Sequence, residues 1–405
     1  MVNVGNKSIR NIILGFLSYY ISSNVLILYL PRTICAVLDL LAIVLVCKAY
    51  IMMPKRKIDA DFDFKLVYYF FFIWGILIAV RGLLSYNSLI EMKEVVSNSE
   101  VFLTYLLPLL YFLKVDKVFF YYLKKIGIFC LGIGFVFFIL NINDLFLNAQ
   151  TFYSELVTAD VDDKYLLLGR CNVQMALLFP LFLFYIGGTF RRKEQLAFLF
   201  SFMLATISIA YAGRRGGLFT AVLYLLSTYF CKIKFKNLLL LVVLVLIVYF
   251  YGLNFLENTF SVLGDRLYDD TRSWAEKELY KGMDSTDWII GKGSTGTFYS
   301  PYFGTQRNVI ETGYLHLALK GGIFYSAAWC YILVTSFIKG FLAKSKMVKV
   351  LSLYILPFIP GMYLFGHPVW DMSYLVLWIC IIFCNSPKYR NSNISFLYDK
   401  NVFEF

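Results

Sequence analysis

Long apolar segments alternate with short polar ones along most of this chain. A membrane-spanning helix needs about 20 mostly apolar residues, and the apolar runs repeatedly approach that length. They predict twelve spanning helices, at residues 11–30, 34–53, 66–84, 101–114, 119–141, 171–190, 196–212, 216–231, 237–254, 311–337, 350–365 and 372–386. The fourth, eighth and twelfth are short for a bilayer. The pattern therefore predicts an all-α polytopic membrane protein.

One polar interval is much longer than the others and begins at Asn254. It is dense in Arg, Asp, Glu and Trp and ends where the tenth predicted span starts. We therefore expect three parts. Residues 1–253 hold nine spanning helices, 254–310 form one large extracytoplasmic loop with short helices, and 311–405 hold three spanning helices and a tail.

Composition supports the membrane assignment. The 405 residues are 60% hydrophobic and only 16% charged, with a mean hydropathy of +0.68. Soluble proteins carry about 25% charged residues, so lipid must solvate part of this apolar surface. The eight cysteines include no C-x-x-C pair, and the chain has two histidines. We expect neither a disulfide framework nor a metal site, and no cofactor.

The formal charge of +12 follows from topology rather than from nucleic-acid binding. Basic residues gather in short clusters between the spans, as the positive-inside rule requires. Alternation then places both termini, with residues 54–65 and 339–349, on the cytoplasmic side of the cell inner (cytoplasmic) membrane. The other side comprises residues 85–100, 141–170, 213–215, 254–310 and 366–371, and it holds most Asp and Glu.

Arg214 and Arg215 are adjacent arginines on the predicted outer face, where the positive-inside rule disfavours them. An arginine fork suits bidentate phosphate binding, and neighbouring glycines such as Gly216 allow a close approach. The alternative is an interfacial anchor whose charged end extends to water. Charges in such positions favour a functional role, and this holds more strongly for Arg215.

The first part of the long loop predicts an amphipathic helix. Arg266 stands four residues before Asp270, so it can act as an ion-pair partner. Arg272 is the stronger candidate cation, since the ring of Trp274 beside it can stack against a sugar. Ser273, followed three residues later by a glutamate, has the spacing of a helix-capping box.

A glycine-rich run follows at residues 291–296, with the sequence GKGSTG. It does not follow a strand that opens a β-α-β unit, which a nucleotide-binding loop would require. We therefore interpret it as a tight turn that shapes the loop.

Arg307, Glu311 and His316 surround the start of the tenth span. We expect Glu311 in the first turn of that helix, where the helix dipole favours a carboxylate and a general base would face outward. His316 does not share a helical face with Glu311, although it does share one with Lys320. A hydrogen-bonded core role is the alternative for His316. The turn at residues 366–371 carries another His and an Asp, but a proline-directed turn with an interfacial Trp explains it better.

These residues resemble the O-antigen class of polysaccharide polymerases (Wzy-type) and ligases. The resemblance rests on four features: an Arg-Gly pair opening a span (Arg215-Gly216), a large outer loop with an Arg near a Trp (Arg272, Trp274), a glycine run, and a Tyr-Leu pair after Glu311. It covers the C-terminal half well and the N-terminal half only by the number of spans. Ligases of the class carry His-Asn where this chain has Glu311-Thr312, so the resemblance favours a polymerase and assigns the base to Glu311 instead of His316.

The resemblance implies a metal-independent glycosyltransferase that acts outside the membrane on undecaprenyl-diphosphate-linked oligosaccharide. Arg215 and Arg272 would neutralise the diphosphate while Glu311 accepts a proton, and Arg214, Arg266, Trp274, Arg307 and His316 would bind substrate. A flippase and a chain-length regulator are the protein partners that the family implies, beside the lipid bilayer.

Two rival functions remain open. An O-antigen ligase would transfer the finished glycan to another acceptor. A lipid-linked oligosaccharide flippase would place charges in a cavity at mid-membrane. Only Asp39 and Lys320 are candidates for such a position, and the predicted spans show no inverted repeat, which favours an enzyme.

Overall fold

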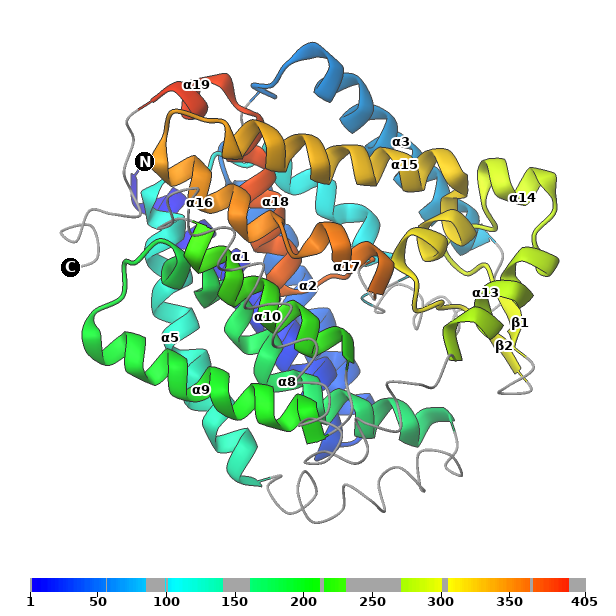
Figure 1. Cartoon of the computed structure of the whole chain (residues 1–405), viewed down its shortest axis with the longest axis horizontal. Helices are drawn as coiled ribbons and strands as arrows, with labels where there is room; N and C mark the ends of the chain where they lie inside the picture. The colour runs from blue at the N-terminus through cyan, green and yellow to red at the C-terminus, as the bar shows by residue number, and fades with distance from the viewer. Residues whose placement is uncertain are drawn as a thin grey trace. The chain divides into compact units, whose positions relative to one another are not determined.

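The computed structural model describes residues 2–55, 57–84, 99, 101–140, 161–211, 215–230, 271–300, 305–364 and 367–392. These residues are almost entirely helical, and one short hairpin is the exception (Figure 1). The chain is a helical membrane protein. Five of its helices are long and apolar enough to cross a membrane, and further apolar helices are shorter.

The chain divides into two compact units. Unit 1 comprises residues 1–20, 32–122 and 270–405, and unit 2 comprises residues 21–31 and 123–269. We describe each unit by itself. Two helices cross the division, α1 (Val2–Asn24) and α5 (Lys117–Leu140).

Unit 1 contains most of the described helices. Its further elements are α2 (Arg32–Met52), α3 (Phe62–Leu84), the 3-10 helix η2 (Leu103–Phe112), α13 (Thr271–Gly282), α14 (Ser285–Ile290), β1 (Phe298–Ser300), β2 (Thr305–Arg307), α15 (Gly313–Phe341), α16 (Lys346–Ile355), α17 (Phe358–Leu364), α18 (Met372–Asn385) and α19 (Pro387–Asn391). Strands β1 and β2 pair antiparallel, with Phe298 opposite Arg307. We call residues 271–300 and 305–310 the loop layer.

Unit 2 is a smaller helical bundle. Its elements are η1 (Leu26–Leu28), α8 (Val161–Ile186), α9 (Arg192–Tyr211) and α10 (Arg215–Phe230). Aromatic rings fill its interior: Phe182 stacks on Tyr224 with ring centroids 4.2 Å apart and meets Phe198 edge-on. Lys124 pairs with Glu194 at 2.8 Å, which compensates both charges at the end of the bundle.

Most predicted spans correspond to helices, but those at 101–114, 350–365 and 311–337 differ in form. The segment predicted at 101–114 is a 3-10 helix containing Pro108, because proline lacks the N–H that an α-helix needs. The segment predicted at 350–365 is two helices, α16 and α17. The predicted span 237–254 lies outside the described residues.

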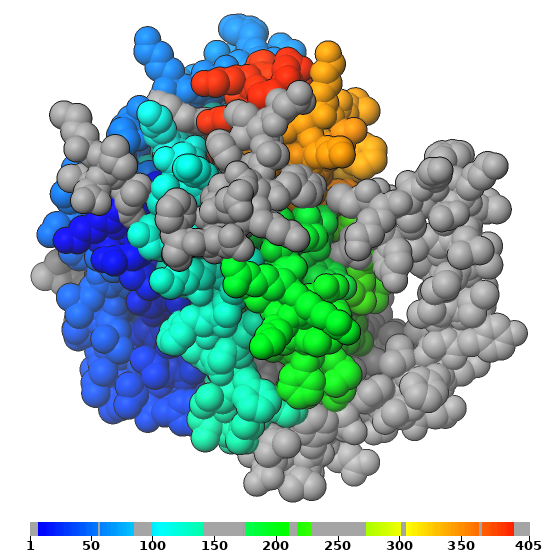
Figure 2. Space-filling view, turned by 90° about the vertical axis from the view of Figure 1, so that its left-hand side faces the viewer, coloured from blue at the N-terminus to red at the C-terminus, as the bar shows by residue number. Residues whose placement is uncertain are grey.

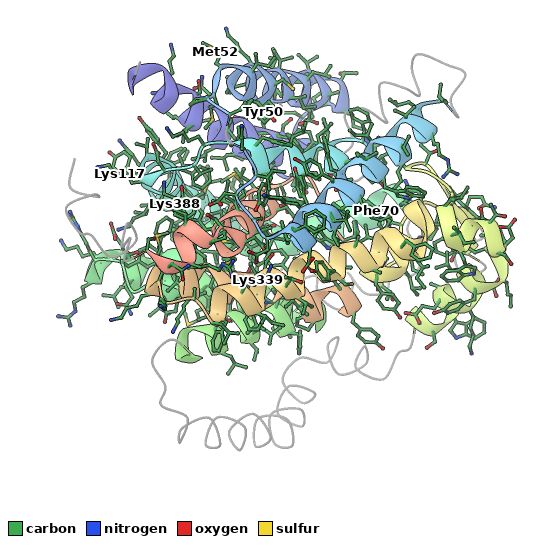
Figure 3. All side chains as sticks on the ribbon, turned by 90° about the horizontal axis from the view of Figure 1, so that it is seen from above. Tyr50, Met52, Phe70, Lys117, Lys339 and Lys388 are labelled. Atoms are coloured by element: carbon green, nitrogen blue, oxygen red, sulfur yellow. The ribbon has the colours of Figure 1, made fainter. Side chains whose placement is uncertain are left out.

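Lipid-facing and protein-facing sides are distinct on α3. Its exposed side chains include Leu66, Ile73 and Val80, at seven-residue intervals that place them on one face of the helix. The opposite face carries Phe71, whose ring stacks on Tyr325 of α15 with centroids 4.5 Å apart. Figure 3 shows α3, which carries Phe70, running beside α15. Figure 2 shows the blue N-terminal segment, which includes α2, on the surface.

Helix α15 is broken, although sequence analysis predicts one continuous span at 311–337. Gly322 has φ 81° and ψ 172°, which no helix permits. The Ser326 hydroxyl donates to the Tyr314 carbonyl at 2.8 Å, whereas twelve residues of straight helix would separate them by about 18 Å. Residues 313–321 therefore fold back on residues 323–341. We call these the short arm and the long arm, and only the long arm, at about 28 Å, approaches bilayer thickness.

The two ends of unit 1 gather different parts of the sequence. At one end, Asp61 pairs with Lys339 at 2.6 Å and with Arg390 at 3.1 Å. At the other end, Arg81 of α3 donates to the Ile290 carbonyl, and the Thr104 hydroxyl to the Pro368 carbonyl. Segments that the alternation of spans assigns to the same side of the membrane thus lie at the same end of unit 1. Which end faces the cytoplasm stays a prediction.

Candidate functional site

The glycine-rich run at 291–296 supplies hydrogen-bond donors to the broken helix α15. A break at Gly322 deprives the carbonyl groups just before it of their helical donors. Three donors from elsewhere replace them: the Lys292 N–H bonds the Leu319 carbonyl at 2.7 Å, the Gly293 N–H bonds the Lys320 carbonyl at 3.0 Å, and the indole of Trp74 bonds the Gly321 carbonyl at 2.8 Å. The run serves as a backbone partner for α15, in keeping with its interpretation as a shaping turn.

Glycine is required at both sides of this contact. Gly291 and Gly322 both have positive φ, at 71° and 81°, which side chains disfavour. A Cβ at Gly322 would lie 1.9 Å from the Ile289 carbonyl oxygen, and one at Gly291 would lie 2.3 Å from the Lys320 carbonyl. The loop layer and the short arm therefore approach each other as closely as two backbones can.

Lys320 belongs to the same contact. Its side chain is only 1% exposed, and its Nζ donates to the Gly296 carbonyl at 2.8 Å. Within unit 1, this charge lies against the loop layer, in the short arm. Its position therefore gives no support to a transport cavity.

Glu311 precedes the short arm and is not in its first turn, contrary to the sequence expectation. Thr312 is the N-cap residue of α15, and the helix begins at Gly313. The break lets the helix start later than the apolar pattern suggests, since only the long arm has to cross the membrane. Glu311 is half-buried at the junction between the loop layer and the short arm.

Glu276 of α13 is a carboxylate that sequence analysis did not select. Its Oε1 accepts a hydrogen bond from the Thr312 hydroxyl, across 36 residues of sequence. Ser273 lies inside α13, which begins at Thr271, so the predicted capping box does not form there. The capping box in this region is made by Asp284 and Asp287 at the start of α14. No local signal links Glu276 to Thr312, because the contact depends on the fold.

The two histidines of the chain meet at the short arm. The rings of His316 and His367 stack with centroids 4.0 Å apart, and both residues are buried. The Nδ1 of His316 has no hydrogen-bond partner among the described residues. His367 of the predicted turn thus contributes a ring to this site, which the interpretation as a plain turn had not suggested.

Asp371 closes the same turn as the N-cap of α18. Its carboxylate accepts from the Tyr374 N–H at 2.8 Å and from the Ser373 hydroxyl at 2.6 Å. Burial raises the pKa of Asp371 to about 6, and the hydrogen bonds counteract only part of that effect.

The structure describes the other predicted site residues to different extents. Trp274 lies on α13 with 68% of its side chain exposed, and Arg307 ends β2 half-buried. Arg272 is the second residue of α13, and Arg215 opens α10 in unit 2, but neither side chain is described. Arg214 and Arg266 lie outside the described residues.

The described part of the site offers carboxylates, a hydroxyl, aromatic rings and a buried imidazole pair. In the described ranges, no group of three or more His, Cys, Asp or Glu side chains could hold a metal ion. Such a set can accept protons and bind hydroxyl groups of a polar ligand.

Comparisons with known protein families, with curated proteins and with solved structures found no match to this chain.

Proposed function

We propose that this chain is a membrane glycosyltransferase. It would polymerise undecaprenyl-diphosphate-linked oligosaccharide repeat units into a surface polysaccharide at the outer face of the cytoplasmic membrane. The proposal rests first on the resemblance of residues 215–322 to the O-antigen polymerases, described above from the Arg-Gly pair, the large loop and Glu311.

One structural observation carries the proposal further. Within unit 1 the loop layer packs on the short arm through a shared apolar cluster that includes Leu279, Phe298 and Leu319. This packing holds Glu276 and Glu311 beside Thr312, at the end of the unit opposite the Asp61–Lys339–Arg390 cluster. A lipid-linked donor needs such a site, with polar groups next to helices that contact the bilayer.

The chemistry is a displacement at the anomeric carbon of the donor. The acceptor hydroxyl oxygen forms the new bond to that carbon while Glu311 takes the hydroxyl proton. The bond to the diphosphate oxygen breaks, and the diphosphate leaves with the electron pair. The resemblance assigns its two phosphates to Arg215 and Arg272, whose cations would stabilise the developing charge. A single displacement inverts the anomeric centre.

The test is the glycan made by a deletion strain of the source cell. A polymerase predicts that single repeat units reach the final acceptor, and that reintroducing the chain restores long polymer. Unattached long polymer would identify a ligase instead, and loss of all exported glycan would identify a transporter. Either of these two results would refute the polymerase assignment.

A reconstituted assay isolates the protein from its partners. Purified chain in vesicles should lengthen lipid-linked repeat units and release undecaprenyl diphosphate without added metal. A flippase and a chain-length regulator are expected partners in the cell, but neither is needed for this reaction in vesicles.

A further inference from the structure

The loop layer carries an aromatic ring pair with one free face. Tyr280 of α13 stacks on Trp288 of α14, with ring centroids 5.5 Å apart and ring planes 22° apart. Trp288 also packs against the apolar cluster below it, whereas Tyr280 is 51% exposed. The Tyr280 ring therefore has support on one face and an open face on the other.

A carboxylate lies on the same side of α13. Glu276 is one helical turn before Tyr280, so the two side chains share a face of the helix. Only its Oε1 accepts a hydrogen bond from the described residues, from the Thr312 hydroxyl, and its Oε2 forms no bond with them. Tyr314 of the short arm packs against the same apolar cluster as Trp288, which places Tyr314 in the neighbourhood of the ring pair.

We propose that Glu276, Tyr280, Trp288 and Tyr314 form a carbohydrate-binding subsite. A pyranose ring has an apolar face of C–H groups that stacks on an aromatic ring, and an edge of hydroxyl groups that donate to a carboxylate. A supported ring with an open face, beside a carboxylate oxygen that accepts no hydrogen bond from the described residues, matches both requirements.

This subsite deepens the proposed function and rests on it. The subsite binds a sugar of the glycan away from the reacting bond, so its residues position substrate and take no part in proton transfer. Glu276 bonds the Thr312 hydroxyl and Glu311 precedes Thr312 in the chain, and we assign them different roles: Glu276 holds a sugar, and Glu311 accepts the proton.

The experiment measures glycan binding by the full chain, purified in detergent. The probe is the repeat-unit oligosaccharide released from the lipid carrier of the deletion strain by mild acid. Tyr280→Ala should weaken binding about tenfold, as removal of a stacking ring does. Tyr299→Ala is the matched control, because Tyr299 of β1 is also 51% exposed in the loop layer but lies outside the subsite.

Glu276→Gln separates sugar binding from structural support. Glutamine keeps an acceptor for the Thr312 hydroxyl and removes the charge, so thermal stability should stay unchanged while binding falls several-fold. Equal affinities for the wild type, Tyr280→Ala and Tyr299→Ala would overturn the subsite.

The two proposals can fail separately. If the wild type does not bind the oligosaccharide, the subsite is wrong, while single-repeat glycan in the deletion strain would still support the polymerase. If long polymer persists in the deletion strain, the polymerase assignment is wrong, whatever the binding result.

Discussion

The two ends of unit 1 differ in the charge partners of the carboxylates that carry the comparison, Asp61 and Glu276. At one end, Asp61, Lys339 and Arg390 neutralise each other, and the Ser386 hydroxyl donates to Asp59. At the other, Glu276 keeps an oxygen without a partner in the described chain, and the His316 Nδ1 is buried in the same state. Groups that bond each other stabilise a fold, whereas groups that lack partners are available to a ligand. Asp61 is neutralised by two cations, whereas the described bond of Glu276 is to a neutral hydroxyl, and this difference favours the second end as the candidate for function.

The largest expected effect comes from the break in α15. Gly322→Ala puts a methyl group 1.9 Å from the Ile289 carbonyl oxygen at a positive φ, so we expect destabilisation by more than about 3 kcal/mol or no folded protein. Thermal unfolding in detergent measures this. Gly282→Ala is the control, since its Cβ would meet nothing within 4 Å. Similar melting temperatures for the two variants would contradict this account of the break.

A second prediction concerns Glu311. Glu311→Gln should reduce polymer formation at least about 100-fold, the loss typical for a missing general base, without lowering the melting temperature. Glu278→Gln changes a carboxylate of the same layer whose ion-pair partner in the described ranges is Lys281, so it should keep wild-type polymer length. If Glu311→Gln still makes wild-type polymer, the proton acceptor lies elsewhere.

A third prediction concerns Asp371, which should make the stability of the folded protein depend on pH. Its pKa in the folded protein, about 6, exceeds the ordinary aspartate value of 3.8, so the folded state binds the proton more tightly. Stability should therefore fall as pH rises from about 4 to 6, by up to about 3 kcal/mol from this group. Asp371→Asn retains a capping side chain and should flatten this slope in melting curves measured across that range. An unchanged slope would show that Asp371 does not titrate there.

The smallest effect is expected at the ion-paired end. Asp61→Asn removes the acceptor of Lys339 and Arg390, but Asp61 is 40% exposed, so solvent already screens the pairs. We expect a loss of about 1 kcal/mol or less and unchanged polymer length. The Lys339 hydrogen bond is also the main cause of the lowered pKa of Asp61. Polymer shortened as strongly as by Glu311→Gln would abolish the distinction between the two ends.

The sequence predicts the spanning helices better than the site. The segments predicted at 34–53 and 66–84 match α2 and α3 within a few residues, because apolar length decides such spans. The break at Gly322 lies inside a continuous apolar run, and its hydrogen-bond partners come from Trp74 and residues 292–293. The Glu276–Thr312 bond is equally non-local. Periodicity contains no information about such contacts, so these features required the structure.

The broken helix also has a consequence for how the protein is made. The short arm carries His316 and Lys320 and spans only about 14 Å, so it is a poor candidate for insertion into lipid by itself. Its last carbonyls receive their donors from Trp74 and from the glycine-rich run, both synthesised earlier. The long arm is synthesised afterwards and can anchor on its own hydrophobicity. The short arm therefore finds its hydrogen-bond donors already synthesised, and we expect it to dock against them instead of inserting into lipid by itself.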